Sequence, residues 1–352
     1  MAERNETCAG APPGRPDPKA GDARPPWRRR LLAATAGLLG TAACAGDAGQ
    51  FSSPAAGAAR SGAPPADAVS FALIGDIPYR ASELAALPAL FDDISDNAQF
   101  AIHVGDIKSG LEPCSDRLLE SRLEALSQIR IPLVYTPGDN EWTDCWRGAA
   151  GDHDPMERLA WLRKRVFDRP VPLLGRQTDR APLRNLQRQS DVDQGLPENL
   201  CWQSPGVVFA TLNVPGSENG RRSPLEESDH REREEANRRW LAHASRTASE
   251  SGATCLVLAI HANPDLGRGL VVTRPLGEDS YAGLRRDLVQ VLERFPGQVL
   301  LLHGDTHRHR VNRIAPRLVR VESFGSPFNS AWVRITVLPR EAQPFVVQAR
   351  YV

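Results

Sequence analysis

Short apolar runs recur along this chain, and each ends at an acidic residue or a histidine beside a glycine or a turn. There are five: residues 71–74 before Asp76, 101–104 before Asp106, 131–135 before Asp139, 256–260 before His261, and 299–302 before Asp305 and His307. Runs this short and this apolar are typical of strands buried on both faces of a sheet. Because α/β sheets bind ligands beyond the carboxyl ends of their strands, we expect these side chains to meet along one edge.

Amphipathic segments separate most of these runs. Apolar residues at helical spacing predict helices over residues 82–95, 115–129, 155–167, 226–246 and 279–294. The polar segment 171–199 predicts a loop, and residues 207–213 predict a strand. Three apolar segments near the end, 318–323, 332–338 and 345–351, have no helix between them and predict antiparallel strands. The pattern predicts an α/β fold, a two-sheet β-sandwich flanked by helices, in one domain over residues 68–352.

The N-terminal region shows neither the periodicity of a helix nor that of a strand. A basic stretch, Arg28–Arg30, precedes an apolar stretch that ends at Ala43, which predicts an export signal over residues 1–44, of the twin-arginine type. Cys44 follows a sequence that resembles a bacterial lipobox, so it is a candidate for lipidation and for a membrane tether. The alternatives are simple cleavage, which gives a periplasmic or extracellular protein, and a retained membrane anchor. Residues 45–67, rich in Ala, Gly, Ser and Pro, predict a flexible tether.

Charge and cysteine content narrow the functional classes. The 43 basic and 43 acidic residues balance, so the sequence does not indicate a basic surface for nucleic-acid binding. The chain shows no internal repeat and no heptad pattern, and we expect a monomer. Past the leader, four cysteines remain, which suits an oxidising compartment and allows three pairings. We favour a disulfide between Cys114 and Cys145, because each follows an acidic motif at the expected edge. A second pair, Cys201 with Cys255, would follow by elimination; the alternative is that Cys255 is a buried thiol.

Carboxylates and imidazoles that converge at one edge form a site for one or two divalent cations. In order along the chain, the motifs are Gly75-Asp76, Gly105-Asp106, Gly138-Asp139-Asn140-Glu141, His261 and Gly304-Asp305-Thr306-His307. This order resembles the calcineurin-like metallophosphoesterases, which include the purple acid phosphatases, over about residues 69–310. The resemblance implies a four-layer α/β/β/α fold. It also implies an exported enzyme that hydrolyses a small-molecule phosphate ester with a hydroxide that bridges two metal ions.

The resemblance implies a role for each matching residue. Asp76 would bind one metal and Asp139 the second, and His261, Asp305 and His307 match further ligand positions of the family. Asp106 would bridge both metals, and Asp106 and Asn140 would be the catalytic residues. The family has Asn and His where this chain has Asp139 and Asp305, and these oxygen ligands favour Mn²⁺, Fe or Mg²⁺ over Zn²⁺.

Two departures from the family pattern bear on activity. Pro78 replaces the His of the first motif, and the neighbouring Tyr79 is a candidate replacement ligand. Asn140 replaces the His of the third motif; it can donate a hydrogen bond to phosphate but cannot act as a general acid. We therefore expect better activity on esters with acidic leaving groups. The alternative is a non-catalytic or mononuclear metal-binding protein on the same fold.

Further residues near the motifs are candidates for contacts to the substrate or to the ligands. They are Lys108, Asn263, His303 and His309. For Lys108 the alternative is a solvated side chain. We expect Glu141 to buttress its turn and His103 to pack in the core. The chain has no G-x-S-x-G elbow and no phosphate-binding glycine loop, so a serine hydrolase or a nucleotide-binding fold is not indicated.

Overall fold

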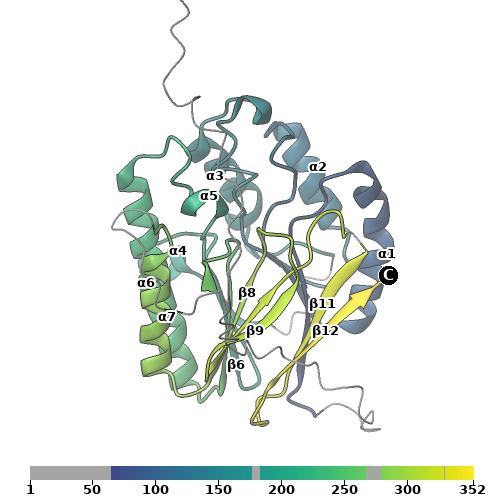
Figure 1. The fold of residues 1–352 in the computed structure, drawn as a ribbon. Coiled ribbons are helices and arrows are strands. Elements are labelled where there is room, and N and C mark those ends of the chain that lie inside the picture. The colour runs from purple at the N-terminus through teal and green to yellow at the C-terminus, as the bar shows by residue number, and fades with distance from the viewer. Residues whose placement is uncertain (1–64, 177–182, 267–269, 271–278, 329) are drawn as a thin grey trace, which may run out of the picture. The chain divides into compact units, whose positions relative to one another are not determined.

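The computed structural model of the protein describes residues 65–176, 183–266, 270, 279–328 and 330–352, and in these residues the strands form two mixed sheets (Figure 1). The five-stranded sheet has the order β12 (Phe345–Tyr351), β11 (Ala331–Val337), β1 (Val69–Ile74), β2 (Phe100–His103) and β3 (Leu133–Tyr135). The seven-stranded sheet has the order β4 (Arg184–Arg188), β5 (Leu200–Ser204), β6 (Val207–Thr211), β7 (Cys255–Ala259), β8 (Gln298–His303), β10 (Leu318–Glu322) and β9 (Arg310–Ala315).

Helices lie between many of these strands, close to the predicted positions. They are α1 (Ala81–Asn97), α2 (Asp116–Leu126), α3 (Pro155–Leu162), α4 (Gln189–Asp193), α5 (Gly216–Asn219), α6 (Glu227–Glu250) and α7 (Ala282–Arg294). A 3₁₀ turn, η2 (Gly148–Ala150), precedes α3, and a π turn, η3 (Arg163–Phe167), extends it. Ser115 caps α2 because its hydroxyl accepts a hydrogen bond from the backbone N–H of Leu118.

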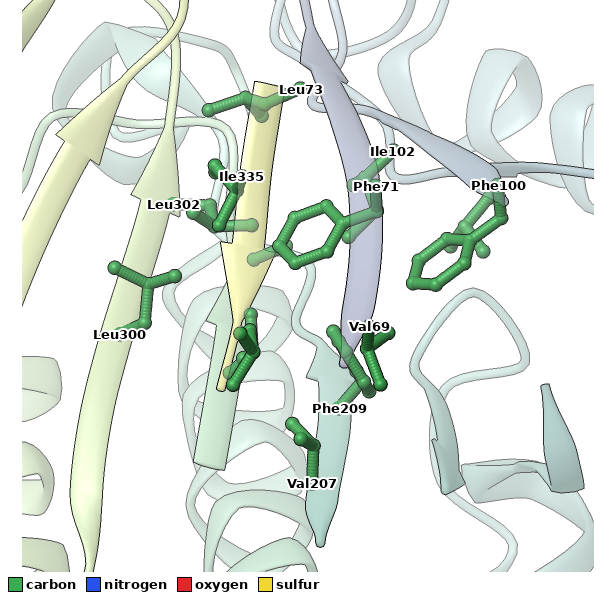
Figure 2. Close-up of a cluster of buried hydrophobic side chains, with 14 of the residues drawn as sticks. Val69, Phe71, Leu73, Phe100, Ile102, Val207, Phe209, Leu300, Leu302 and Ile335 are labelled. Carbon is green, nitrogen blue, oxygen red and sulfur yellow. The ribbon is translucent and has the colours of Figure 1, made fainter. Parts of the chain in front are cut away.

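Three hydrophobic clusters separate four layers of structure. Apolar side chains of both sheets pack against each other in the centre, where the rings of Phe71 and Phe209 lie 5.5 Å apart (Figure 2). The outer face of the five-stranded sheet packs against α1 and α2. The outer face of the seven-stranded sheet packs against α6 and α7. The predicted two-sheet sandwich flanked by helices is therefore confirmed, because each sheet buries both of its faces.

The parallel strands place their carboxyl ends at matching levels. Strands β1, β2 and β3 are parallel, and Ile74, His103 and Tyr135 are register partners at the ends of the three strands. In the other sheet β6, β7 and β8 are parallel, and Ala259 pairs with Leu302. The residues that follow these strands consequently emerge together at one edge of each sheet.

The structure corrects two predictions about the fold. Residues 318–322 form β10, which is antiparallel to β9 but parallel to its other neighbour, β8, whereas β11 and β12 are antiparallel as predicted. Strand β9 is polar, and the sequence pattern did not reveal it. It forms an antiparallel hairpin with β10, so the chain changes direction between the two strands. The predicted loop at 171–199 contains β4 and α4. Strand β4 is polar and pairs with one neighbour, β5, through backbone hydrogen bonds, so it lacks an apolar signature.

The predicted export signal, with Cys44, lies outside the described residues, as does nearly all of the predicted tether. In the part of the chain that the structure describes, no helix is both long and apolar enough to cross a membrane.

Candidate metal centre

The loops that follow β2 and β3 are tied together by one buried carboxylate. Glu141 Oε1 accepts hydrogen bonds from the backbone N–H of Asp106 (3.0 Å), the N–H of Gly138 (2.8 Å) and the hydroxyl of Tyr135 (2.6 Å). A Cβ atom at position 138 would lie 2.0 Å from Asp106 Oδ1, so this close approach requires glycine. The expected buttressing role of Glu141 thus has a geometric basis, since it brings Asp106 and Asp139 to the same place.

Four of the six predicted ligands have left-handed backbone conformations. The φ angles of Asp76, Asp106, Asp305 and His307 are 57°, 60°, 74° and 56°. Positive φ is uncommon for residues other than glycine, and such strain is concentrated at functional sites. The sharp turns direct these side chains back across the strand ends.

Histidine 261 lies at the centre of the site. Its Nε2 atom is 3.0 Å from Asp139 Oδ1, 3.4 Å from Asp106 Oδ1 and 4.0 Å from Asp305 Oδ1. Two sets of three ligand atoms lie within 4.8 Å of one another, Asp76 with Asp106 and His261, and Asp139 with His261 and Asp305. The structure therefore brings five of the predicted ligands together in two adjoining groups that share His261.

The sixth predicted ligand, His307, lies beside the first group. Its Nε2 atom is 3.5 Å from Asp76 Oδ1. The backbone N–H of Asp305 donates to Asp76 Oδ1 at 3.0 Å, which holds the turn after β8 against the end of β1. The two sheets contribute to one site as a result.

Both imidazoles are oriented as metal ligands are. Nδ1 of His261 donates to the carbonyl oxygen of Val104 at 2.6 Å, and Nδ1 of His307 donates to the carbonyl oxygen of Ser326 at 2.8 Å. Each neutral ring then presents the lone pair of Nε2 to carboxylate oxygens, an arrangement that is repulsive unless a proton or a cation lies between them. The donor set therefore fits divalent cations, which would be held by the oxygens and by these two nitrogens.

Tyr79 and Asn140 complete the first group. The hydroxyl of Tyr79 donates to Asp106 Oδ2 at 2.9 Å and lies 3.4 Å from His307 Nε2. The amide nitrogen of Asn140 donates to Asp106 Oδ2 at 2.5 Å and to the Tyr79 oxygen at 3.1 Å. The Tyr79 hydroxyl thus contacts one candidate ligand, Asp106, and lies close to a second, His307.

Burial and crowding of like charges shift the pKa values in the metal-free site. Burial raises the pKa of Asp106 well above its usual value, and burial together with Asp139 raises the pKa of Asp305 to about 6. Burial opposes protonation of His261, but Asp106 and Asp139 raise its pKa well above the usual value. Protons therefore take the place of cations in this site when no metal is bound.

A cleft of about 580 Å³ opens over the ligands. It is lined by the predicted residues Tyr79, Asp106, Asp139, Asn140, Asn263, Asp305 and His307, and by residues that the sequence analysis did not identify, among them Asp144, Arg147, Ser217 and Tyr281. The backbone N–H of Asn263 donates to Asp305 Oδ2 at 3.2 Å, so Asn263 contacts a candidate ligand.

Ser217 reaches the site from a left-handed turn. Ser217, Glu218 and Asn219 in α5 all have φ angles between 49° and 57°. The hydroxyl of Ser217 lies 2.7 Å from Asp139 Oδ2 and 2.9 Å from Asp144 Oδ2. The turn follows β6, a parallel strand that ends at the same edge of the sheet. The position of Ser217 just after a predicted strand could therefore have identified it from the sequence.

Three predicted contact residues lie elsewhere. Lys108 is fully buried, and its ammonium group donates to the carbonyl oxygen of Ser109 at 3.0 Å. His303 is also buried, with Nδ1 bonded to the carbonyl oxygen of Gly304. His309 stacks on Phe324 with the ring centroids 4.3 Å apart. None of the three is among the residues that line the cleft, because local carbonyl groups or rings hold their side chains away from it.

A disulfide joins Cys114 and Cys145, as expected from their positions. The second pairing is wrong, since Cys201 and Cys255 are free and buried. Cys201 packs with the outer core under α6, whereas Cys255 packs between the sheets, so the two side chains lie on opposite faces of one sheet. The alternative of a buried thiol holds for Cys255.

Loss of the disulfide should destabilise the loop that carries Asn140. Both sulfur atoms lie near the carbonyl oxygen of Asn140, at 3.4 and 3.6 Å. A bridge across 31 residues stabilises a fold by about 3–4 kcal/mol through restriction of the unfolded chain. We expect the double variant Cys114→Ser/Cys145→Ser to unfold at a lower temperature in calorimetry. Reductant should lower the wild-type transition and leave the variant unchanged; a wild type insensitive to reductant would contradict this.

Comparisons with known proteins give a likeness of fold. No protein-family model matches the chain, and no curated sequence matches it. Several solved structures match the chain. GAP50, the anchor in the inner membrane complex of Plasmodium, has 9% identity and a TM-score of 0.47 over 81% of this chain and 84% of its own. A dimetal phosphatase from Danio rerio has 11% identity and a TM-score of 0.46, covering 80% and 98%.

A purple acid phosphatase from yellow lupin seeds has 12% identity and a TM-score of 0.42, covering 82% of this chain and 55% of its own.

Proposed function

We propose that this chain is a metal-dependent phosphoester hydrolase. The observation that carries the proposal is the convergence of buried carboxylates on two imidazoles whose Nε2 lone pairs face them. Asp76, Asp106 and Asp139 are at most 6% exposed. Burying so many like charges without cations is costly, and a protein retains such a cluster when cations are part of its function.

The proposed ligands divide between two cations. Asp76 and His307 would hold one, Asp139, His261 and Asp305 would hold the other, and Asp106 would contribute to both. Divalent cations at these positions would neutralise charge on phosphoryl oxygens and make water a stronger nucleophile. The predominance of oxygen donors favours Mn²⁺, Fe or Mg²⁺.

The residues around the ligands bear on the choice of ester. Water forms a bond to phosphorus while the ester P–O bond breaks and the leaving alcohol takes a proton. Asn140 lines the cleft and supplies N–H groups, but an amide N–H is too weakly acidic to protonate a leaving group. The proposal therefore includes a preference for esters whose leaving groups are acidic and need no protonation.

Export is also proposed. The Cys114–Cys145 disulfide supports it, since disulfides persist in oxidising compartments outside the cytosol. Lipidation of Cys44, and with it a membrane tether, remains part of this proposal.

The test measures metal content and hydrolysis together. The full chain, purified and reconstituted with Mn²⁺, Fe²⁺, Mg²⁺ or Zn²⁺ in turn, should hold about two ions. It should cleave aryl phosphates with rates that rise steeply as the leaving phenol becomes more acidic. A protein that holds one ion or none and cleaves neither monoesters nor diesters would instead be the non-catalytic metal-binding protein that Pro78 and Asn140 favour.

A further inference from the structure

One guanidinium group lies inside the acidic cleft next to the ligands. The described residues that line the cleft include two arginines, Arg147 and Arg222, and seven acidic residues. Arg222 pairs with Glu218 at 3.0 Å, and its side chain is 64% exposed. Arg147 is less exposed, at 39%, and it contacts the residues that surround the candidate metal ligands.

Arg147 is two hydrogen bonds away from a ligand. Its Nη2 atom donates to the Ser217 hydroxyl oxygen at 3.2 Å, and that hydroxyl lies 2.7 Å from Asp139 Oδ2. Its Nη1 atom forms an ion pair with Asp144 Oδ2 at 2.7 Å, and the Asp144 side chain is only 2% exposed. The guanidinium is thus fixed by these two contacts at the wall of the cleft that the candidate ligands also line.

The backbone around Arg147 is held firmly. Arg147 follows the disulfide-bonded Cys145 by two residues, and its own N–H donates to the carbonyl oxygen of Asp144 at 3.2 Å. Its carbonyl oxygen accepts from the N–H of Ala150 at 2.8 Å. A guanidinium has five N–H groups, and the contacts to Asp144 and Ser217 leave others to face the cleft.

We infer that Arg147 binds a terminal oxygen of the substrate's phosphoryl group and selects phosphate monoesters over diesters. This inference rests on the proposed function. A monoester has three terminal oxygens and carries one more negative charge than a diester. With two oxygens held at the cations, the third can accept from Arg147, whereas a diester presents an ester oxygen and its alkyl group there.

The site needs such a donor for a further reason. Asn140 occupies the motif position where the family that the sequence resembles has a His, and its amide is neutral. Among the described residues that line the cleft, Arg147 is the permanently charged donor adjacent to the ligands. The competing interpretation is that Arg147 only holds Ser217 and Asp144 in place.

The experiment uses the metal-loaded full chain and inorganic phosphate as the probe. Titration calorimetry should show that Arg147→Gln weakens phosphate binding about 10- to 100-fold, the range for one lost charge-assisted hydrogen bond, with metal content unchanged. Arg147→Lys should retain part of the affinity. The matched control is Arg165→Gln, because Arg165 lies outside the cleft and pairs with Glu120; it should change the phosphate affinity less than twofold.

Kinetics separate a phosphate contact from a structural role. Arg147→Gln should lower kcat/KM for an aryl monoester by the same factor and for the matching diester less than threefold. Added guanidinium ion should restore part of the monoester activity of Arg147→Ala. Equal losses on both esters, no rescue, or wild-type phosphate affinity in Arg147→Gln would overturn the inference.

The two proposals fail in different ways. If the wild type cleaves nothing but its phosphate affinity depends on Arg147, the hydrolase proposal fails and the phosphate site stands. If the wild type cleaves monoesters and Arg147→Gln is unaffected, the inference about Arg147 fails alone. A wild type that binds no phosphate overturns the inference as well.

Discussion

Replacement of Asp106 by alanine should abolish hydrolysis, with a loss of at least about 10³-fold in kcat/KM, and should empty the metal site. Asp106 Oδ1 lies 3.4 Å from His261 Nε2, and Oδ2 accepts from Tyr79 and Asn140. One carboxylate therefore contacts both the shared histidine and the residues around the first group. The measurement is metal content by mass spectrometry, alongside hydrolysis of an aryl phosphate.

The same substitution should stabilise the chelator-treated protein. Asp106 is 4% exposed and close to other carboxylates, so its removal relieves repulsion when no cation is present. Asp92→Asn is the control, since Asp92 lies on α1 in a pair with Arg130 and should leave metal content and activity unchanged. An Asp106→Ala protein that retains two ions and cleaves at the wild-type rate would refute the proposed role.

The strand ends were predictable because their signals are local. A buried parallel strand requires a continuous apolar run, and a glycine followed by an acidic residue marks its end, so Asp76, Asp106 and Asp139 could be placed from sequence alone. Strands β4 and β9 carry no such signal. They lie at the two edges of their sheet and are held by backbone hydrogen bonds that any residue can make.

The remaining parts of the site depend on tertiary contacts. Ser217 reaches Asp139 only because three successive residues adopt left-handed conformations, which no periodicity encodes. Arg147 contacts Asp144, three residues before it, and Ser217, 70 residues after it, and no motif in the sequence marks either contact. The failure of the Cys201–Cys255 pairing has the same origin, because the face of a sheet on which a side chain lies is set by strand register.

Removal of metal should make stability depend on pH in a direction that the pKa shifts define. Asp106 and Asp139 raise the pKa of His261 despite its burial, and Asp76 raises the pKa of His307. Burial and the charge of Asp139 raise the pKa of Asp144 to about 7. Above about pH 7.5, where an unfolded histidine has lost most of its protons, the folded metal-free protein therefore still binds protons that the unfolded chain has released. The free energy of unfolding should fall as pH rises, by about 1.4 kcal/mol per pH unit for each such proton.

Histidines with lowered pKa values do not cancel this slope. Burial lowers the pKa of His103, His230, His243 and His309, and lowers that of His303 to about 3. These groups oppose the slope near pH 6.5, where the unfolded histidines are half protonated, and contribute little about one pH unit higher. Burial also lowers the pKa of Lys108, which opposes the slope only toward the alkaline limit.

Bound metal should reverse the pH dependence. Cations displace the protons from the imidazoles and carboxylates, and they bind more tightly as pH rises because fewer protons compete. At a thousandfold excess over the dissociation constant, one cation should add about 4 kcal/mol to the free energy of unfolding.

Chemical denaturation of the full chain at pH 6.5, 7.5 and 8.5, with chelator or with Mn²⁺, tests both slopes. His261→Gln should flatten the metal-free slope, and a metal-free wild type whose stability rises with pH would show that the site does not hold protons in place of cations.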